Sequence, residues 1–200
     1  FRNTAVISPV LEEGKLQLLF SGKAHPEDDI GKSIIKELVK MDRHFKDNVI
    51  FLENYNKKIA RLIVRGCDIW LNNPCRPLEA SGTSGMKAAL NGALNLSVLD
   101  GWVGEGVKHG VCGWLLDEYP HTSLEDADED ERDLEALYQI LIHEAIPTYY
   151  QNRPKWIEMM RASIKMAKDY FTSERMIKEY YEKMYRKTVN SQQDKSPSIT

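Results

Sequence analysis

The sequence predicts an α/β protein in which helices cover both faces of a parallel sheet, a Rossmann-like, doubly wound arrangement. Two observations carry this prediction. Short apolar runs alternate with amphipathic stretches through residues 16–99, a pattern typical of the strand–helix–strand units that build parallel sheets. Beyond them, apolar residues at helical spacing predict terminal helices at 134–146, 156–171 and 173–185.

The elements follow in order from the period of the apolar residues and from the turn residues between them. An opening helix extends to about Val10. Strands are predicted at 16–20, 49–52, 67–71 and 94–99, and helices at 28–46, 55–64 and 84–91. Ligands of such sheets bind where the strands end, so the loops at 21–26, 72–85 and 100–113 are where function is expected.

The chain is predicted to form one domain over residues 1–187, followed by a disordered tail at 188–200, because that polar segment has little to bury. An acidic stretch at 125–133 precedes the terminal helices and is interpreted as a solvated loop and a first helical turn. The sequence has no initiator methionine and opens on helical sequence. We therefore expect it to be a piece of a longer protein.

Composition argues against several classes of partner. The 200 residues carry a formal net charge of −3, which gives no general attraction to nucleic acid or to an anionic membrane. No apolar run approaches the roughly 20 residues that cross a bilayer, and no secretory signal is recognised at the start. The three cysteines have neither CxxC nor zinc-site spacing, which favours free thiols in a reducing compartment and hence a cytoplasmic location.

The most informative segment runs from Glu79 to Lys87 and reads EASGTSGMK. It lies between a predicted strand and a predicted helix. Its glycines and small side chains would let backbone amides approach a ligand closely, and Thr83 and Ser84 are suitable helix N-caps. A helix beginning here directs unpaired N–H groups and the positive end of its dipole at an anion, so a phosphate group is the expected ligand.

Lys87 is expected in the first turn of this helix, where the dipole and burial would both favour the neutral, nucleophilic amine. A phosphate cradle beside such a lysine suits pyridoxal phosphate. Taken alone, the same residues also fit a nucleotide site, or a plain turn followed by a surface lysine. They do not match the P-loop pattern GxxxxGK[ST], because Ala88 follows the lysine where that motif needs a hydroxyl.

Three segments of the chain match one known family in order and spacing. They are EASGTSGMKAALNGA at 79–93, GKAHP at 22–26 and LDGW at 99–102. The first resembles the cofactor segment of α-glucan (glycogen or starch) phosphorylases of the bacterial and archaeal type, and the other two resemble further segments of that family. Weaker similarity extends into the final helices. The resemblance implies the carboxy-terminal half of a two-domain glycosyltransferase fold.

The resemblance also implies roles for individual residues. Lys87 would carry pyridoxal 5'-phosphate, and the cofactor phosphate would be surrounded by the backbone of Gly82, Thr83, Ser84 and Gly85. The glucosyl unit would be hydrogen-bonded by Glu79, Ser81 and Gly82. In this family the cofactor's phosphate exchanges a proton with substrate phosphate, so the complete enzyme would convert α-1,4-glucan and phosphate to glucose 1-phosphate.

Some family features are changed or absent. Val103 stands where relatives more often have a second tryptophan, and Cys112 stands where they have asparagine. The family's basic segment, which holds substrate phosphate, would lie just before Phe1, and the amino-terminal domain that closes over the sugar is absent too. We therefore expect the chain alone to bind cofactor better than it catalyses.

Two alternative functions stay open at this point. A nucleotide-sugar glycosyltransferase half would share the fold and place a glutamate near the position of Glu79. A non-catalytic domain with glucan affinity would keep the fold without the chemistry.

Four further residues are weaker candidates. His25 follows a predicted strand, where it could contact a ligand or order its own turn, and Lys23 could reach an anion or face solvent. Tyr55 and Asn56 could line the cleft, although Tyr55 is expected to pack at a helix start. The other histidines have no metal-ligand spacing, and the four tryptophans are expected in the core or at an interface.

Aromatic and methionine residues recur along the last two predicted helices. We expect them to be mostly core, but any exposed part would drive self-association into a homo-oligomer. The stripe comprises Met159, Met160, Met166, Tyr170, Phe171, Met176, Tyr180, Tyr181, Met184 and Tyr185.

Overall fold

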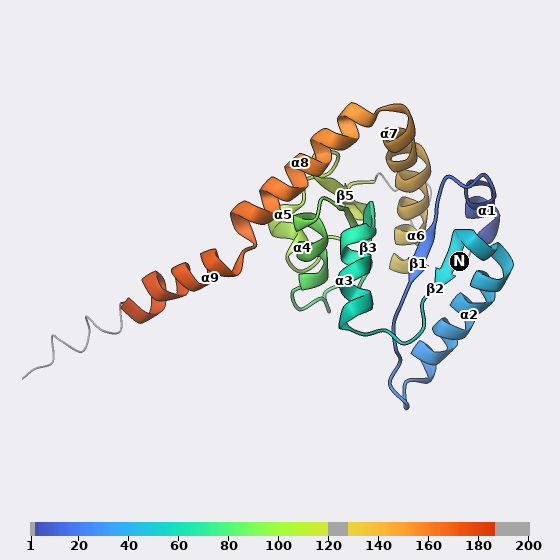
Figure 1. Cartoon of the computed structure of the whole chain (residues 1–200), viewed down its shortest axis with the longest axis horizontal. Helices are drawn as coiled ribbons and strands as arrows, with labels where there is room; N and C mark the ends of the chain where they lie inside the picture. Colours follow the sequence, from blue (N-terminus) through green and yellow to red (C-terminus); the bar gives the residue numbers. More distant parts are fainter. Residues whose placement is uncertain (1–2, 120–127, 187–200) are drawn as a thin grey trace, which may run out of the picture.

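The computed structural model describes residues 3–119 and 128–186 (Figure 1). The predicted disordered tail at 188–200 and the start of the acidic stretch, 125–127, lie outside the described residues. The described strands are β1 (Leu18–Phe20), β2 (Val49–Phe51), β3 (Ile69–Asn72), β4 (Leu94–Ser97) and β5 (Gly113–Leu115). Each of the predicted strands corresponds to one of β1 to β4, within a few residues.

The described helices are α1 (Thr4–Glu12), α2 (Asp29–Phe45), α3 (Lys57–Gly66), α4 (Thr83–Leu90), α5 (Val103–Gly106), α6 (Glu129–Ile140), α7 (Ile146–Gln151), α8 (Arg153–Tyr170) and α9 (Ser173–Tyr180). Two short 3-10 helices lie at Lys46–Asn48 and Leu116–Glu118. A π-helical turn, Leu141–Ala145, joins α6 to α7, and a second, Tyr181–Tyr185, extends α9. The sequence predicted the terminal helices but missed α5 and β5.

Every strand pair in the described residues is parallel, which confirms the predicted α/β architecture. In one ladder β1 pairs with β2, and in the other β4 lies between β3 and β5. The expected single sheet is thus divided into two hydrogen-bonded parts. Among the described residues, neither β1 nor β2 pairs with β3. In β4 every residue is buried, as expected for a parallel strand flanked on both sides.

Both ladders pack into a shared hydrophobic core. Leu18 of β1, Val49 of β2 and Leu96 of β4 contact the same cluster, together with residues of α1 and α6. Its centre includes Trp114 and Trp156, whose ring centroids lie 5.9 Å apart. The two parts of the sheet are therefore joined by side-chain packing.

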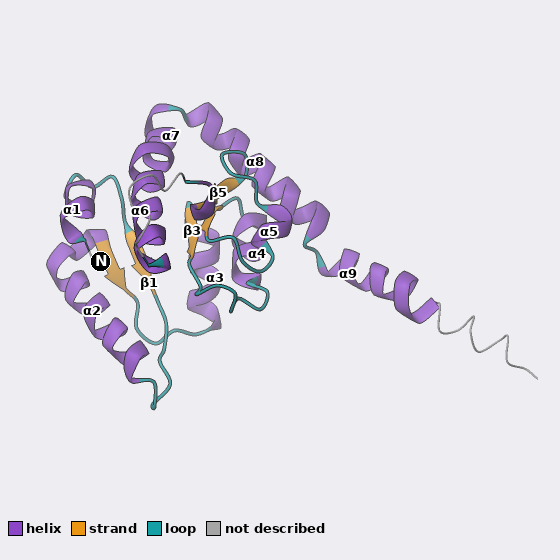
Figure 2. Ribbon diagram, turned by 180° about the vertical axis from the view of Figure 1, so that it is seen from behind, coloured by secondary structure: helices purple, strands orange, loops and turns teal. Residues whose placement is uncertain are grey.

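A second core cluster lies where α8 crosses α4 and α5 (Figure 2). It contains Trp102, Val107 and Met166, with Phe171 at its edge. The buried Ser163 hydroxyl of α8 donates a hydrogen bond to the Ala93 carbonyl oxygen (3.0 Å), which fixes α8 to the start of β4. Ala89 of α4 belongs to this cluster and Met86 packs against it, so the cluster supports the buried face of the helix that carries Lys87.

The end of the described chain leaves this core. Figures 1 and 2 show α9 projecting away from the body, beyond the end of α8. Its N-cap is Thr172, whose hydroxyl accepts a hydrogen bond from the Arg175 amide (3.3 Å). None of the described helices combines the length and apolarity needed to span a membrane.

Candidate functional site

The helix predicted to hold a phosphate begins at Gly82. This residue is the N-cap of α4 and has a left-handed backbone (φ 78°), and no side chain caps the helix. The prediction that Thr83 or Ser84 caps the helix is therefore wrong: they are its first two residues. Glycine holds the cap because only glycine adopts this backbone conformation at little cost.

Lys87 is the fifth residue of α4, because the helix begins at Thr83, one residue earlier than the sequence predicted. The predicted burial of Lys87 is also wrong for this chain, because its side chain is exposed. Thr83 precedes it by four residues, so the two side chains lie on the same helix face. No described residue forms a hydrogen bond or ion pair with the Lys87 ammonium.

The two faces of α4 differ sharply. Gly85, Ala88 and Ala89 are buried, and Ala89 belongs to the second core cluster, whereas Thr83, Ser84 and Lys87 are exposed. Small residues on the buried face let α4 lie close to the core, and the polar residues face outward. The amides of Thr83 and Ser84 are at the first two helical positions and have no acceptor among the described residues, so an anion could accept from them.

Trp102 explains why two of the predicted site residues are glycine. A methyl group at Gly82 would lie 3.0 Å from Cδ1 of Trp102, and one at Gly85 would lie 3.1 Å from its Nε1. The sequence suggested that these glycines admit a ligand, but the indole ring of Trp102 already fills the space beside them. Trp102 is 3% exposed, which agrees with its predicted place in the core.

Replacing Gly85 by alanine is expected to lower the free energy of unfolding by about 1–2 kcal/mol. Alanine gains up to about 1 kcal/mol of helix propensity over glycine, but its methyl group would lie 2.7 Å from Oδ1 of Asn95, and such overpacking costs about 1–3 kcal/mol. Gly104→Ala is the control, because there the nearest atom is 3.8 Å away. Urea denaturation should show Gly104→Ala neutral or stabilised; Gly85→Ala behaving in the same way would contradict the packing described.

Glu79 lies beside the start of α4. Its backbone N–H donates to Oδ2 of Asp100 (3.0 Å), and a methyl group at Gly101 would lie 2.8 Å from its Cγ. The Trp102 amide also approaches the Ser81 carbonyl oxygen, at 3.4 Å. The loops before α4 and after β4 are therefore held together beside the start of α4.

Among the described residues, no hydrogen bond or ion pair joins the weaker candidates to the start of α4. His25 is exposed and orders its own turn, because its Nδ1 accepts from the Glu27 amide (3.2 Å). Asn56 is the N-cap of α3 and accepts from the amides of Lys58 and Ile59. Lys23 and Tyr55 are exposed.

One feature of the site had no signal in the sequence. Arg76, in the loop between β3 and α4, binds the carboxylates of Asp117, Glu129 and Asp133. The acidic stretch was interpreted as a solvated loop and a first helical turn. Its helical part is confirmed, since Asp128 caps α6, but Glu129 and Asp133 are ion-paired with Arg76. Sequence spacing could not reveal a pair that is separated by 57 residues.

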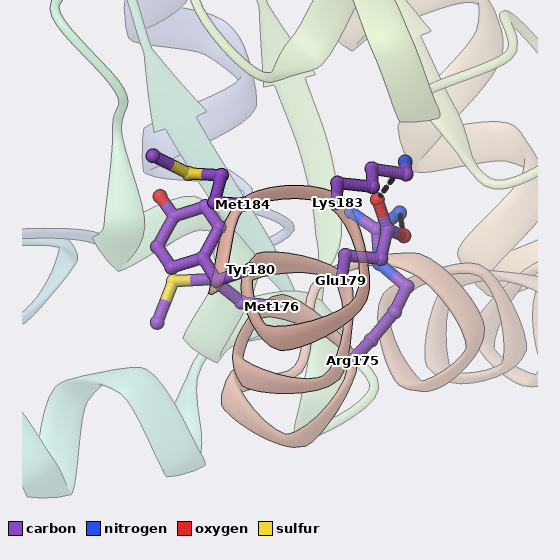
Figure 3. A pocket seen from close by; sticks show the side chains of 6 residues that line it. All are labelled: Arg175, Met176, Glu179, Tyr180, Lys183 and Met184. Atoms are coloured by element: carbon purple, nitrogen blue, oxygen red, sulfur yellow. Dashed lines mark hydrogen bonds and ion pairs between the residues drawn. The ribbon is translucent and has the colours of Figure 1, made fainter. Parts of the chain in front are cut away.

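A pocket of about 330 Å³ lies elsewhere, on α9 and its π-helical extension (Figure 3). It is lined by Arg175, Met176, Glu179, Tyr180, Lys183 and Met184. All of its lining residues come from one projecting helix. In the described residues, no group of three or more His, Cys, Asp or Glu side chains could hold a metal ion.

Comparison with known proteins identifies the family. The family model for carbohydrate phosphorylases matches residues 9–105. The chain is 48% identical over 181 residues to maltodextrin phosphorylase of Thermococcus litoralis, and 44% identical over 187 residues to glycogen phosphorylase of Aquifex aeolicus. The chain belongs to the carbohydrate phosphorylase family. The resemblance noted in the sequence is confirmed.

These alignments cover 88% and 90% of the chain but only 21% and 26% of the two phosphorylases. The chain thus spans about a fifth to a quarter of the length of the phosphorylases it matches. Among solved structures, HepE of Anabaena in complex with UDP superimposes with a TM-score of 0.64 at 20% identity, over 91% of this chain and 44% of HepE. At that identity the likeness shows the fold alone, and it agrees with a Rossmann-like half of a larger protein.

Proposed function

We infer that this chain is the carboxy-terminal part of an α-glucan phosphorylase and that the start of α4 holds pyridoxal 5'-phosphate. The observation that carries the proposal is the exposed face of α4, where Lys87 follows two free backbone amides. The complete enzyme would use phosphate to cleave α-1,4-glucan and release glucose 1-phosphate. The identity to maltodextrin and glycogen phosphorylases supports this activity.

The residues present fit the cofactor. The amides of Thr83 and Ser84 and the positive end of the α4 dipole would bind the cofactor phosphate, and the two hydroxyl groups add donors. Lys87 has no carboxylate partner among the described residues, so its amine is available to the cofactor's aldehyde. In the complete enzyme, the remaining domains would bury the Lys87 side chain. When bound, the cofactor supplies a phosphate group that exchanges a proton with substrate phosphate.

The chain's own residues would bind and orient the substrate. Glu79, Ser81 and the backbone of Gly82 lie next to the phosphate cradle and would hydrogen-bond the glucosyl hydroxyls. Asp100 holds the Glu79 backbone in place through the 3.0 Å hydrogen bond. Groups fixed in this way would orient the glucosyl unit without reorganising during the reaction. Its positive, oxocarbenium-like transition state would be stabilised by adjacent phosphate anions held by preorganised donors.

Catalysis would need partners that this chain does not provide. Glucan, phosphate and the amino-terminal domain of the complete enzyme would complete the proposed site, and the basic segment that holds substrate phosphate would belong to the rest of that enzyme. We therefore expect no release of glucose 1-phosphate by the chain alone. Turnover by the purified chain would contradict this assignment of roles.

Selective labelling of Lys87 tests the proposal. The chain is incubated with substoichiometric pyridoxal phosphate, reduced with borohydride and mapped by mass spectrometry. We expect Lys87 to be labelled roughly tenfold more than other lysines, because charged hydrogen bonds at a helix start contribute about 1.5–3 kcal/mol. Pyridoxal without its phosphate is the matched control and should show no preference, and Lys87→Arg should lose the label.

Two outcomes would refute the cofactor site. Labelling spread evenly over the lysines would mean that Lys87 is an ordinary surface lysine. Equal labelling by pyridoxal and pyridoxal phosphate would mean that the start of α4 does not bind the phosphate. Either result would favour a non-catalytic glucan-binding domain of this family.

A further inference from the structure

One guanidinium group connects three parts of the chain around the site. Nη1 and Nη2 of Arg76 donate to the two carboxylate oxygens of Asp133 on α6, at 2.8 and 3.0 Å. Nη2 also donates to Oδ2 of Asp117 (2.9 Å), and Nη1 to Oε1 of Glu129 (3.1 Å). The Arg76 side chain is only 17% exposed, so these contacts are shielded from bulk water.

Asp117 extends this network to the loop after β4. The same Oδ2 that accepts from Arg76 also accepts from the Leu99 backbone N–H, at 2.7 Å. The next residue, Asp100, accepts from the Glu79 backbone N–H. The network therefore begins in the loop before α4, passes through Asp117 into the loop after β4, and returns to the first loop at Glu79.

The electrostatics favour a fixed arrangement. Burial disfavours the charged form of Arg76, but the hydrogen bonds to Asp133 and Asp117 outweigh it and raise the pKa of the guanidinium above its ordinary value. Arginine suits this place because its planar group donates to one carboxylate with two nitrogens and still reaches two others. Lysine would offer a point charge without that geometry.

We propose that Arg76 is a positioning residue that sets the loops at 73–82 and 99–102 relative to α6, and thereby holds Glu79 and the start of α4 in place for the sugar and the cofactor. The purpose of this role rests on the proposed function. The hydrogen-bond network from Arg76 through Asp117 to Glu79, here called the clamp, can be tested without any ligand. Asp133 is its main anchor, because it is 22% exposed and receives two hydrogen bonds, whereas Glu129 is 63% exposed and receives one.

Hydrogen exchange of single amides tests the clamp in the 200-residue chain. In Asp133→Asn and in Arg76→Lys, the amides of Glu79 and Leu99 should exchange at least about tenfold faster than in the wild type, since each donates to a carboxylate that the clamp positions. Amides of β4 should change less than about threefold. Glu129→Gln is the matched control, because it makes the same chemical change on the same helix and should leave Glu79 and Leu99 almost unaltered.

The outcomes separate this proposal from the proposed function. Unchanged exchange at Glu79 and Leu99 in both variants overturns the clamp, and so does an equal rise in β4, which would mean a general loss of stability. If exchange changes as expected while the wild type takes no selective label at Lys87, the clamp stands and the cofactor site fails. If Lys87 is labelled selectively, Asp133→Asn should reduce that labelling severalfold, whereas Glu129→Gln should not.

Discussion

Replacing Trp102 by alanine is expected to lower the free energy of unfolding by about 3–5 kcal/mol, the usual cost of truncating a buried aromatic residue. Trp102 is 3% exposed, and its ring meets Phe171 edge to face with centroids 4.9 Å apart. It also fills the space beside Gly82 and Gly85. The truncation should therefore open a cavity under the start of α4, and urea denaturation would measure the loss as a lower midpoint.

Trp102→Phe separates packing from polar effects at this position. Nε1 of Trp102 is buried without a hydrogen-bond partner in the described residues, and a buried donor left unpaired costs about 1–3 kcal/mol. Phenylalanine keeps an aromatic ring and removes that donor, so we expect it to cost no more than about 1.5 kcal/mol. A loss as large as that of Trp102→Ala would mean that the indole N–H has a partner in solution.

The same truncation should weaken the proposed cofactor site. Selective labelling of Lys87 depends on the amides at the start of α4 keeping their direction, and Trp102 supports those residues from the buried side. We expect the preference for Lys87 over other lysines to fall severalfold in Trp102→Ala but not in Trp102→Phe. An unchanged preference in the alanine variant would show that α4 keeps its geometry without Trp102.

The spacing of apolar residues and the positions of turn residues predicted most of the fold, because most of its helices and strands are specified by neighbouring residues in the sequence. In α2 the apolar spacing is visible in the sequence, which predicted a helix at 28–46, and the helix spans Asp29–Phe45. By contrast, α5 and β5 were missed. They are four and three residues long and include Gly104, Gly106 and Gly113, so no period could develop.

The sequence predicts the site as one continuous segment, but the internal geometry of that segment depends on distant residues. The sequence suggested that glycines at 82 and 85 admit a ligand, whereas Trp102, about twenty residues away along the chain, fills the space beside them. The cap was assigned to Thr83 or Ser84 from side-chain chemistry, whereas the left-handed backbone of Gly82 decides it. The ion pairs of Arg76 likewise depend on how α6 packs, which no local pattern encodes.

If copies of the chain associate through α9, replacing both Ile177 and Tyr181 by serine is expected to weaken that association strongly. Six apolar or aromatic residues of α9 and its π-helical extension are between 45% and 62% exposed: Met176, Ile177, Tyr180, Tyr181, Met184 and Tyr185. Figure 3 shows three of them, Met176, Tyr180 and Met184, aligned on one side of the helix, with the ion-paired Arg175, Glu179 and Lys183 on the other. A helix this short is marginal in water without a partner surface.

The expected size of this effect follows from the area lost. If two copies pair through this face, each contributes Ile177 and Tyr181, and half-burying one such side chain contributes roughly 0.7 kcal/mol. Removing all four should weaken the dimer by about 2.8 kcal/mol, which is a hundredfold in its Kd. Sedimentation velocity over a range of protein concentrations would measure the shift.

A matched control distinguishes the apolar face from the helix itself. Glu174→Ser with Lys178→Ser also places two serines four residues apart on α9 and leaves the net charge unchanged. It lowers helix propensity at least as much, because serine ranks with isoleucine and tyrosine but below glutamate and lysine. We expect this double variant to associate as the wild type does. If both double variants dissociate alike, association depends on α9 being helical and not on its apolar side chains. A wild-type chain that stays monomeric at high concentration would mean that this face needs a different partner, which in the proposed enzyme is the rest of the polypeptide.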